Sequence, residues 1–366
     1  MPIEIESPEE MGYDTIEFNL AESSIRDRAL GDYNLDLNKT VLAYTEHRGI
    51  VPLREAIMRE STLPSVDVLV TTGAAMALFL IATTLLEKDD HTLVIRPNYA
   101  TNLETPRAIG CEMTIVDLDF DTDFSLNTEG VLKAITAKTK LISITNPHNP
   151  TGVLFPLNTI KKLIKIAEKY NCYLLIDETY RELNFKSTLN PYAAELSKNV
   201  ISVSSLSKAY GVPGIRTGWL ITQDKILMHN LLAAKEQIIL GNSVLDEAVA
   251  LHILNNKKTL LPLIHKQINI NYIIFKTWFN QQKYLEWVEP EAGVVCFPRL
   301  KKEFNLEFNS FKKALYEDYK TVVGFGHWFE QSSIYFRIGF GFPTEIELKE
   351  GLLRFEKCLS EHVYTA

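Results

Sequence analysis

The stretch "VISVSSLSKAYGVPGIRTGWLIT", residues 200–222, holds two apolar, β-branched runs separated by a polar loop. Runs of this kind, at 200–207 and 216–222, are typical of buried strands. In this loop, Lys208 comes after several serines and is followed by Gly211, Gly214 and Arg216. A surface lysine needs no such surroundings, so the stretch raises the question of whether Lys208 is solvated or reactive. We expect the two glycines to let the backbone bend so that Arg216 returns towards Lys208.

The same kind of strand recurs on the N-terminal side of this stretch, alternating with helical patterns from about residue 66 onwards. Such alternation predicts an α/β fold with a mainly parallel sheet covered by helices on both faces. Residues 74–87 and 157–170 show the helical spacing. Seven strands are predicted, at residues 66–72, 91–97, 112–119, 140–147, 172–178, 200–207 and 216–222.

Beyond residue 222 the pattern changes to long amphipathic segments with short strands in "GVVCFPRL" (293–300) and "SIYFRIGFG" (333–341). Thr344 and Glu347 form a capping box for a last helix. We predict a smaller α+β domain here, joined by the N-terminal residues. The predicted division is a large domain at 40–255 and a small domain made of 1–39 and 256–366.

Composition limits the class of protein and its partners. The 366 residues are 46% hydrophobic and 23% charged, which is typical of a globular protein. The formal charge of -8 predicts neither nucleic acid nor an anionic membrane as a partner. The acidic N-terminus does not resemble a signal peptide, and the longest weakly polar run, 73–86, is too short to span a membrane. We therefore expect a cytoplasmic location.

The four cysteines, Cys111, Cys172, Cys296 and Cys358, show no CxxC spacing. This favours buried free thiols over a disulfide or a metal site, and no metal is expected.

Polar residues follow the predicted strands, where open α/β sheets place their ligands. Singly, each has an ordinary explanation as a turn, loop or cap residue. Together they match the needs of pyridoxal 5′-phosphate (PLP): a lysine for its aldehyde, a carboxylate for its ring nitrogen, donors for its phenolic oxygen, an aromatic ring to stack on, and a helix N-terminus with a cation for its phosphate. The candidates are Gly73, Tyr99, Asn149, Asp177, Tyr180, Ser205, Lys208 and Arg216.

With these residues, the chain resembles a class I/II, fold-type I, PLP-dependent aminotransferase over nearly its whole length. The resemblance lies in the order and spacing of seven motifs. They are "YTEHRGIVPLREAI" (44–57), "TTGAAMAL" (71–78), "RPNYA" (96–100), "NPHNPTG" (146–152), "DETYREL" (177–183), "SSLSKAYGVPGIRTGW" (204–219) and "YFRIGFG" (335–341).

The resemblance implies a role for each matched residue around the cofactor ring. Lys208 would form the Schiff base, and Asp177 would pair with the ring nitrogen. Asn149 and Tyr180 would reach the phenolic oxygen, and Tyr99 would stack on the ring.

The resemblance also implies how the phosphate and the substrate are held. The phosphate would be bound at Gly73 and by the backbone of Ala74 and Ala75, with Ser205 and Arg216. Tyr44 would reach the phosphate of the neighbouring subunit, which implies a homodimer with shared active sites. Arg337 would bind the substrate α-carboxylate beside Asn149, since its planar fork offers two hydrogen bonds.

The predicted reaction is transamination between an amino acid and a 2-oxo acid by a ping-pong cycle. Lys208 would remove the Cα proton as general base, made less basic by its site.

The N-terminal segment "EFNLAESSIRD" (17–27) departs from the glycine- and proline-rich segment of the family. Glu22, Ser23, Ser24 and Glu46 form either a polar pocket for a cationic or polar amino acid or a solvated acidic face. The segment faintly resembles enzymes such as capreomycidine synthase, so elimination, cyclisation or decarboxylation remains an alternative reaction.

Two further alternatives concern a sensor function and the histidines. A non-enzymatic PLP sensor is disfavoured, since the sequence shows no helix-turn-helix extension or basic arm. His148, beside Asn149, is expected to position the loop rather than to catalyse, and His47 is expected near the dimer interface.

Overall fold

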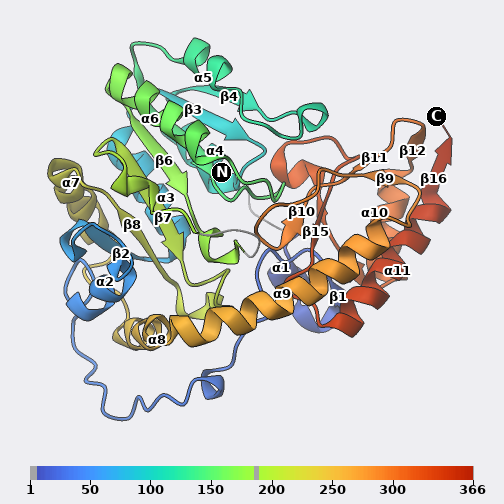
Figure 1. Cartoon of the computed structure of the whole chain (residues 1–366), viewed down its shortest axis with the longest axis horizontal. Coiled ribbons are helices and arrows are strands. Elements are labelled where there is room, and N and C mark those ends of the chain that lie inside the picture. Colours follow the sequence, from blue (N-terminus) through green and yellow to red (C-terminus); the bar gives the residue numbers. More distant parts are fainter. Residues whose placement is uncertain (1–5, 185–188, 366) are drawn as a thin grey trace.

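A seven-stranded sheet forms the centre of the computed structural model, which describes residues 6–184 and 189–365 (Figure 1). Strand β8 is antiparallel to both of its neighbours, and the other pairings are parallel. All seven predicted strands and the mainly parallel sheet are confirmed. Across the sheet the order is β2 (Val68–Thr72), β8 (Thr217–Ile221), β7 (Val200–Ser205), β6 (Tyr173–Asp177), β5 (Thr139–Thr145), β3 (His91–Arg96) and β4 (Glu112–Asp117).

Helices cover both faces of this sheet because its strands are apolar on both sides. In β6, Leu174 and Ile176 pack in one apolar cluster with α6 (Leu157–Tyr170), while Leu175 packs in another with α3 (Gly73–Leu85) and α7 (Lys225–Glu236). This alternation follows from the two-residue repeat of a strand. The other helices of this region are α2 (Val51–Met58), α4 (Ala100–Ile109), α5 (Thr128–Ala134) and α8 (Val244–Asn255).

The long helix α9 (Lys257–Phe279) runs from the large sheet to a second group of elements (Figure 1). Strand β1 (Phe18–Asn19) pairs in parallel with β13 (Thr321–Val322), so the N-terminal segment packs on this group. The domain limits themselves stay a prediction. The group also contains α1 (Pro8–Met11), β9 (Leu285–Glu286), β10 (Val295–Cys296), β11 (Arg299–Leu300), β12 (Phe304–Leu306), α10 (Phe308–Glu317), β14 (Gly324–Phe325), β15 (Phe336–Gly339), α11 (Glu345–His362) and β16 (Val363–Thr365).

Two smaller predictions about these elements are confirmed. The Thr344 side chain accepts a hydrogen bond from Glu347 N, and Thr344 N donates to the Glu347 carboxylate at 2.8 Å, which is the predicted capping box of α11. All four cysteines are buried free thiols. Among the described helices, none combines the length and the apolar character that crossing a bilayer requires.

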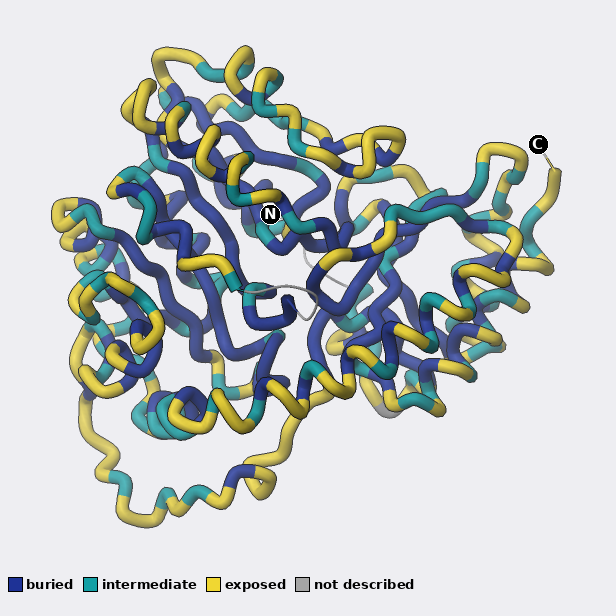
Figure 2. Tube along the Cα trace, in the orientation of Figure 1, coloured by how far each residue is buried: buried dark blue, intermediate teal, exposed yellow. Residues whose placement is uncertain are grey.

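Residues 33–50 form an arm without helix or strand that loops away from the body of the molecule (Figure 2). Three apolar side chains on it are largely exposed: Val41 by 76%, Leu42 by 75% and Tyr44 by 89%. The base of the arm is held firmly, since the buried Lys235 donates from Nζ to the His47 carbonyl at 2.5 Å.

Candidate active site

The predicted site residues lie where the parallel strands of the large sheet end. Asp177 and Ser205 are the last residues of β6 and β7, and Lys208 follows three residues after Ser205. Gly73 follows β2 directly, and Tyr99 begins α4 after β3. Because these strands run the same way, their carboxyl ends meet at one edge of the sheet. The structure therefore brings together residues that are more than 100 positions apart in the sequence.

The Asp177 carboxylate is buried with few partners of its own. Its Oδ1 accepts hydrogen bonds from Thr179 N at 3.0 Å and from Thr179 Oγ1 at 2.5 Å. Burial raises the pKa of Asp177, although the Thr179 hydrogen bonds and the Lys208 charge act in the opposite direction. A buried carboxylate is stabilised by a cationic donor. The protonated ring nitrogen of PLP is a donor of this kind, so Asp177 suits the cofactor.

The cofactor-free chain does not make Lys208 less basic, and a lowered basicity of the amine during turnover stays a prediction. Burial lowers the pKa of Lys208, but the charges of Tyr180 and Glu22 raise it, and the net direction is upwards. The physical reason is that acidic groups from distant parts of the chain face the amine.

The N-terminus of α3 forms a tightly packed cradle beside Arg216. Gly73 has φ +76°, and a Cβ there would lie 2.6 Å from Arg216 Nη2. A Cβ on Gly218 would lie 2.5 Å from Ala74 N, so β8 can approach the helix only because it has a glycine there. The first N–H groups of a helix have no partner within the helix and attract anions. These features fit the phosphate of PLP. Gly218 belongs to this cradle, although it was not among the residues predicted from the sequence.

The two glycines between Lys208 and Arg216 differ. Gly211 has φ +63°, and a Cβ on it would lie 2.3 Å from the Arg26 carbonyl, so this position requires glycine. Gly214 has no positive φ, and a Cβ there would meet nothing within 4 Å. The expectation for Gly214 is therefore wrong, because the bend is made at Gly211 and at Arg216 itself, whose φ is +42°.

Arg337 joins the two parts of the molecule at this site. Its Nη1 donates to Asn149 Oδ1 at 3.2 Å, and its Nη2 donates to the Ala21 carbonyl at 2.7 Å. The guanidinium also lies 5.0 Å from the centre of the Phe329 ring. An arginine held in this way has its position fixed before a carboxylate arrives.

Two predicted tyrosines of the cofactor site differ in exposure. Tyr180 is buried, with its ring 4.0 Å from where a Cβ on Gly293 would lie. Tyr99 is 37% exposed at the start of α4, as expected for a ring that meets a bound molecule.

The N-terminal segment docks directly on the loop that carries Lys208. Ile25 N donates to the Lys208 carbonyl at 3.2 Å, and Arg28 N donates to the Gly211 carbonyl at 2.7 Å. Glu22 accepts a hydrogen bond from Tyr13 at 3.4 Å, and its charge acts on Lys208. Of the proposed polar set, Glu22 therefore lies at the site.

The other members of that set are placed differently. Ser23 and Ser24 are buried. Glu46 lies on the exposed arm, where its charge acts on Arg54 and Glu247.

Two predicted histidines have structural surroundings. His148 is buried, with Nδ1 2.8 Å from Thr151 Oγ1, and burial lowers its pKa to about 3. A neutral ring bonded within its own loop suits a positioning role. His47 Nδ1 contacts the Glu236 carboxylate at 2.5 Å at the base of the arm.

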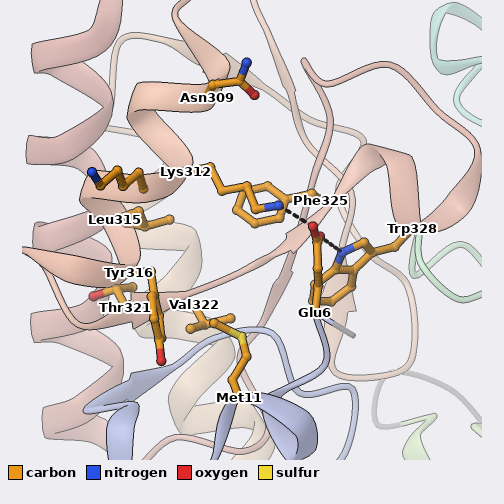
Figure 3. Close-up of a pocket in the computed structure, with 11 residues that line it drawn as sticks. Glu6, Met11, Asn309, Lys312, Leu315, Tyr316, Thr321, Val322, Phe325 and Trp328 are labelled. Atoms are coloured by element: carbon orange, nitrogen blue, oxygen red, sulfur yellow. Dashed lines mark hydrogen bonds and ion pairs between the residues drawn. The ribbon is translucent and has the colours of Figure 1, made fainter. Parts of the chain in front are cut away.

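A pocket of about 380 Å³ lies elsewhere, between α10 and the N-terminal residues (Figure 3). Its wall includes Lys312, Phe325 and Trp328, and the Glu6 carboxylate contacts both Lys312 and Trp328. None of the predicted cofactor residues lines it, so it is separate from the site at the sheet edge.

Comparisons with known proteins agree with this geometry. The family described as aminotransferase class I and II matches residues 19–354. The chain is 27% identical to the aspartate aminotransferase of Thermotoga maritima over 335 residues, which cover 88% of this chain and 85% of that protein. It is 31% identical to the probable aspartate aminotransferase of Methanocaldococcus jannaschii over 228 residues, 57% of this chain and 60% of that protein.

Solved structures show the same fold. A PLP-dependent aminotransferase from Streptococcus suis matches with a TM-score of 0.88 at 23% identity, covering 96% of each chain. The PLP-dependent cyclase OrfR matches with a TM-score of 0.86 at 23% identity, covering 99% of each chain. The cofactor implied by the family is PLP, in agreement with the donors at the sheet edge. The chain therefore belongs to the class I and II aminotransferase family and has its fold-type I architecture.

Proposed function

We propose that this enzyme transfers an amino group between an amino acid and a 2-oxo acid with the help of PLP, whose aldehyde carbon Lys208 would hold. The observation that carries the proposal is the contact of Arg337 with Asn149, 3.2 Å apart. Arg337, the proposed ligand of the substrate carboxylate, thus contacts the loop that follows β5, and this contact supports the proposal. An amino acid held there by its carboxylate has its Cα next to the lysine.

The residues around the cofactor divide by the atoms that they would hold. Asp177 would keep the ring nitrogen protonated, and the bound cofactor would supply an electron-withdrawing ring. Tyr180 and Asn149 would hold the phenolic oxygen, and Tyr99 would lie on the ring face. The helix α3 N-terminus at Gly73, Ala74 and Ala75, with Ser205 and Arg216, would hold the phosphate.

Lys208 would act as the base, since its amine could take a proton from the substrate Cα and later give it back. The pKa of Lys208 is raised in the cofactor-free chain, although burial lowers it. The proposal therefore requires a lower pKa of this amine during turnover.

The exposed arm supports assembly into a homodimer. Val41, Leu42 and Tyr44 would leave water on contact with a second copy, and Tyr44 would then reach the partner's phosphate. Sedimentation of the purified protein measures the assembly directly. The composition and charge of the chain support a cytoplasmic location.

The deciding experiment offers single amino acids to the PLP-loaded protein and follows conversion of the cofactor to its amino form by absorbance. Conversion together with release of a 2-oxo acid supports transamination. Failure of every amino acid to convert the cofactor would overturn the proposal.

A second candidate is elimination or cyclisation of a substrate with a cationic side chain, or its decarboxylation. The observation that favours it is Glu22, which places a carboxylate near Lys208 where an acidic substrate would be repelled. In the same screen this reaction gives a product without a 2-oxo acid and without accumulation of the amino form.

A further inference from the structure

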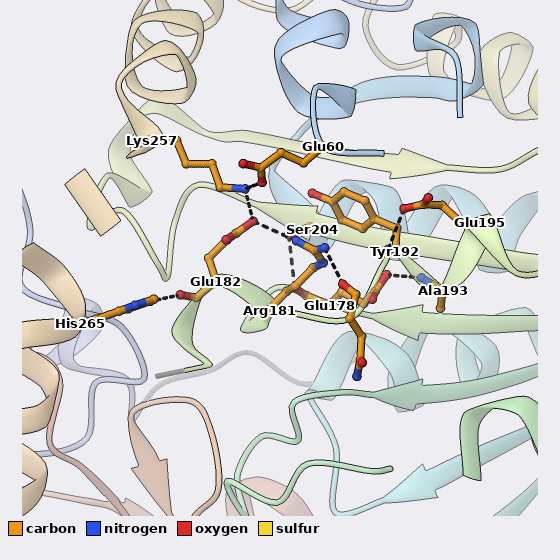
Figure 4. A network of polar contacts seen from close by, with 11 residues as sticks. Glu60, Glu178, Arg181, Glu182, Tyr192, Ala193, Glu195, Ser204, Lys257 and His265 are labelled. Atoms are coloured by element: carbon orange, nitrogen blue, oxygen red, sulfur yellow. Dashed lines mark hydrogen bonds and ion pairs between the residues drawn. The ribbon is translucent and has the colours of Figure 1, made fainter. Parts of the chain in front are cut away.

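A polar cluster surrounds Glu182 (Figure 4), which lies two residues after Tyr180. It comprises Glu60, Arg181, Glu182, Lys257 and His265, and we call it the Glu182 clamp. These residues come from three places: the end of α2, the segment after β6, and helix α9. The proposed function does not use any of them.

Glu182 is the centre of the clamp. Its Oε1 accepts hydrogen bonds from Lys257 Nζ at 2.9 Å and from Arg181 Nη1 at 3.1 Å. Its main-chain carbonyl accepts a hydrogen bond from His265 Nε2 at 2.6 Å. Lys257 and His265 both belong to α9, so one helix holds both the side chain and the backbone of Glu182.

The contacts are shielded from water. The Glu182 side chain is 9% exposed, and those of Arg181 and Lys257 are 11% and 19% exposed. An ion pair with this little exposure is screened much less than a surface pair, and removal of one partner leaves a buried charge. Lys257 also binds the more exposed Glu60 at 2.7 Å, and Arg181 lies 4.2 Å from the centre of the Tyr192 ring. The clamp therefore has a defined geometry.

The backbone of Glu182 is tied to that of Tyr180. The two residues lie in one tight turn, in which Leu183 N donates to the Tyr180 carbonyl at 2.9 Å and Arg181 N donates to the Glu178 carbonyl at 2.9 Å. Displacement of Glu182 therefore displaces Tyr180.

Helix α9 also holds the strand of Arg337. The buried Asn271 on α9 donates from its amide to the carbonyls of Phe340 and Pro343, each at 2.8 Å, directly after β15. Arg337 lies within β15. Pro262 lies inside α9, but the part of the helix from His265 to Asn271 follows it and is about 9 Å long, so the contacts of these two residues keep a fixed spacing.

We propose that Glu182 is a positioning residue, which through Lys257, His265 and helix α9 sets the place of Tyr180 relative to Arg337. This rests on the proposed function, in which Tyr180 contacts the cofactor and Arg337 the substrate.

The test compares Glu182→Gln and Lys257→Met with Lys276→Met. Lys276, which also lies on α9, forms an ion pair with Glu289 outside the helix, and its side chain is 43% exposed, so it controls for loss of a charge from α9. The first readout is the absorbance of the PLP-loaded proteins against pH. The second is kcat/KM with a converting amino acid.

In Glu182→Gln and Lys257→Met, we expect the midpoint of the absorbance titration to move by about half a pH unit or more. The reason is that Tyr180 no longer holds the phenolic oxygen in place. We expect kcat/KM to fall about tenfold or more. Lys276→Met should change neither. Loss of thermal stability with an unchanged titration and unchanged kcat/KM would mean a purely structural role and overturn the proposal.

Hydrogen exchange in the cofactor-free proteins keeps the test independent of the proposed function. The amide of Leu183 should exchange faster in Lys257→Met than in the wild type or Lys276→Met. Equal exchange rates of the Leu183 amide in the wild type and both variants would overturn the proposed role of the Glu182 clamp. A wild type that binds PLP but converts no amino acid would instead overturn the proposed function and leave the clamp standing.

Discussion

The proposed cofactor side and the proposed substrate side of the site are built in different ways. On the proposed cofactor side, Gly73, Asp177 and Lys208 lie at or just after the ends of strands of one sheet, and neighbouring strands fix their spacing. On the proposed substrate side, Arg337 is held by the Ala21 carbonyl, from a residue 316 positions away in the sequence. The difference teaches that the proposed cofactor residues come from short local motifs, whereas the place of the proposed substrate residue depends on segments from opposite ends of the chain. A substitution on the cofactor side should therefore alter the affinity for PLP, and one on the substrate side should alter KM for the amino acid.

The largest effect is expected where the two sides meet. Lys208→Ala removes both the covalent anchor and the base, so kcat should fall by about 10³-fold or more. Borohydride treatment followed by mass spectrometry should no longer attach the cofactor. Lys225→Ala, at an exposed lysine at the start of α7, is the control and should stay active. Normal transamination by Lys208→Ala would refute the mechanism.

Arg337→Lys tests the substrate side alone. Lysine cannot reproduce the two parallel hydrogen bonds to a carboxylate, so KM for the amino acid should rise by about 10²-fold while affinity for PLP is unchanged. Steady-state kinetics and a PLP titration measure the two constants. Arg354→Lys, on α11 and bonded to Glu350, serves as the matched control. A large loss of PLP affinity in Arg337→Lys would contradict the division between the two sides.

Gly73→Ala tests the cofactor side. The new Cβ would displace Arg216 from the helix N-terminus, at a φ that alanine rarely adopts. Loss of a charge-assisted hydrogen bond worth about 1.5–3 kcal/mol predicts a 10- to 100-fold weaker affinity for PLP. Gly214→Ala is the control, since its Cβ enters open space. Equal PLP affinities in the two variants would show that the cradle does not bind the phosphate.

The smallest effect concerns the charge that links the N-terminal segment to Lys208. Glu22 raises the pKa of Lys208 in the cofactor-free chain, so Glu22→Gln should lower it and increase the share of free amine at neutral pH. Because the free amine attacks the aldehyde, attachment of PLP near pH 7.5 should be about threefold faster in stopped-flow measurements. Glu10→Gln, at an exposed glutamate in α1, is the control. A slower attachment in Glu22→Gln would show that Glu22 does not raise the pKa of Lys208.

Much of the cofactor side was predictable because its signals are local. Apolar β-branched runs located all seven strands, and the residues after them followed from the edge that parallel strands share. The errors came from long-range contacts. The basicity of Lys208 depends on Tyr180 and Glu22, which no local pattern places beside it. Gly211 and Gly214 look alike in the sequence, and they are distinguished by the positive φ of Gly211 and by the approach of the Arg26 carbonyl to it.

The substrate side was less predictable for the same reason. The sequence pattern favours a solvated acidic face over a pocket for residues 22–24, and only the docking of Ile25 on the Lys208 carbonyl brings this segment to the site. Gly218 offered a usable signal, because a glycine within a buried strand indicates a close backbone approach.

The left-handed backbone at Arg216 has a consequence for how the cofactor arrives. A non-glycine residue at φ +42° and ψ +42° costs about 1–3 kcal/mol relative to a relaxed backbone. Folding meets this cost, and the missing side chain of Gly73 leaves room for the Arg216 guanidinium. A phosphate bound there, as proposed, would meet a cradle that is preorganised, so binding would lose little conformational entropy.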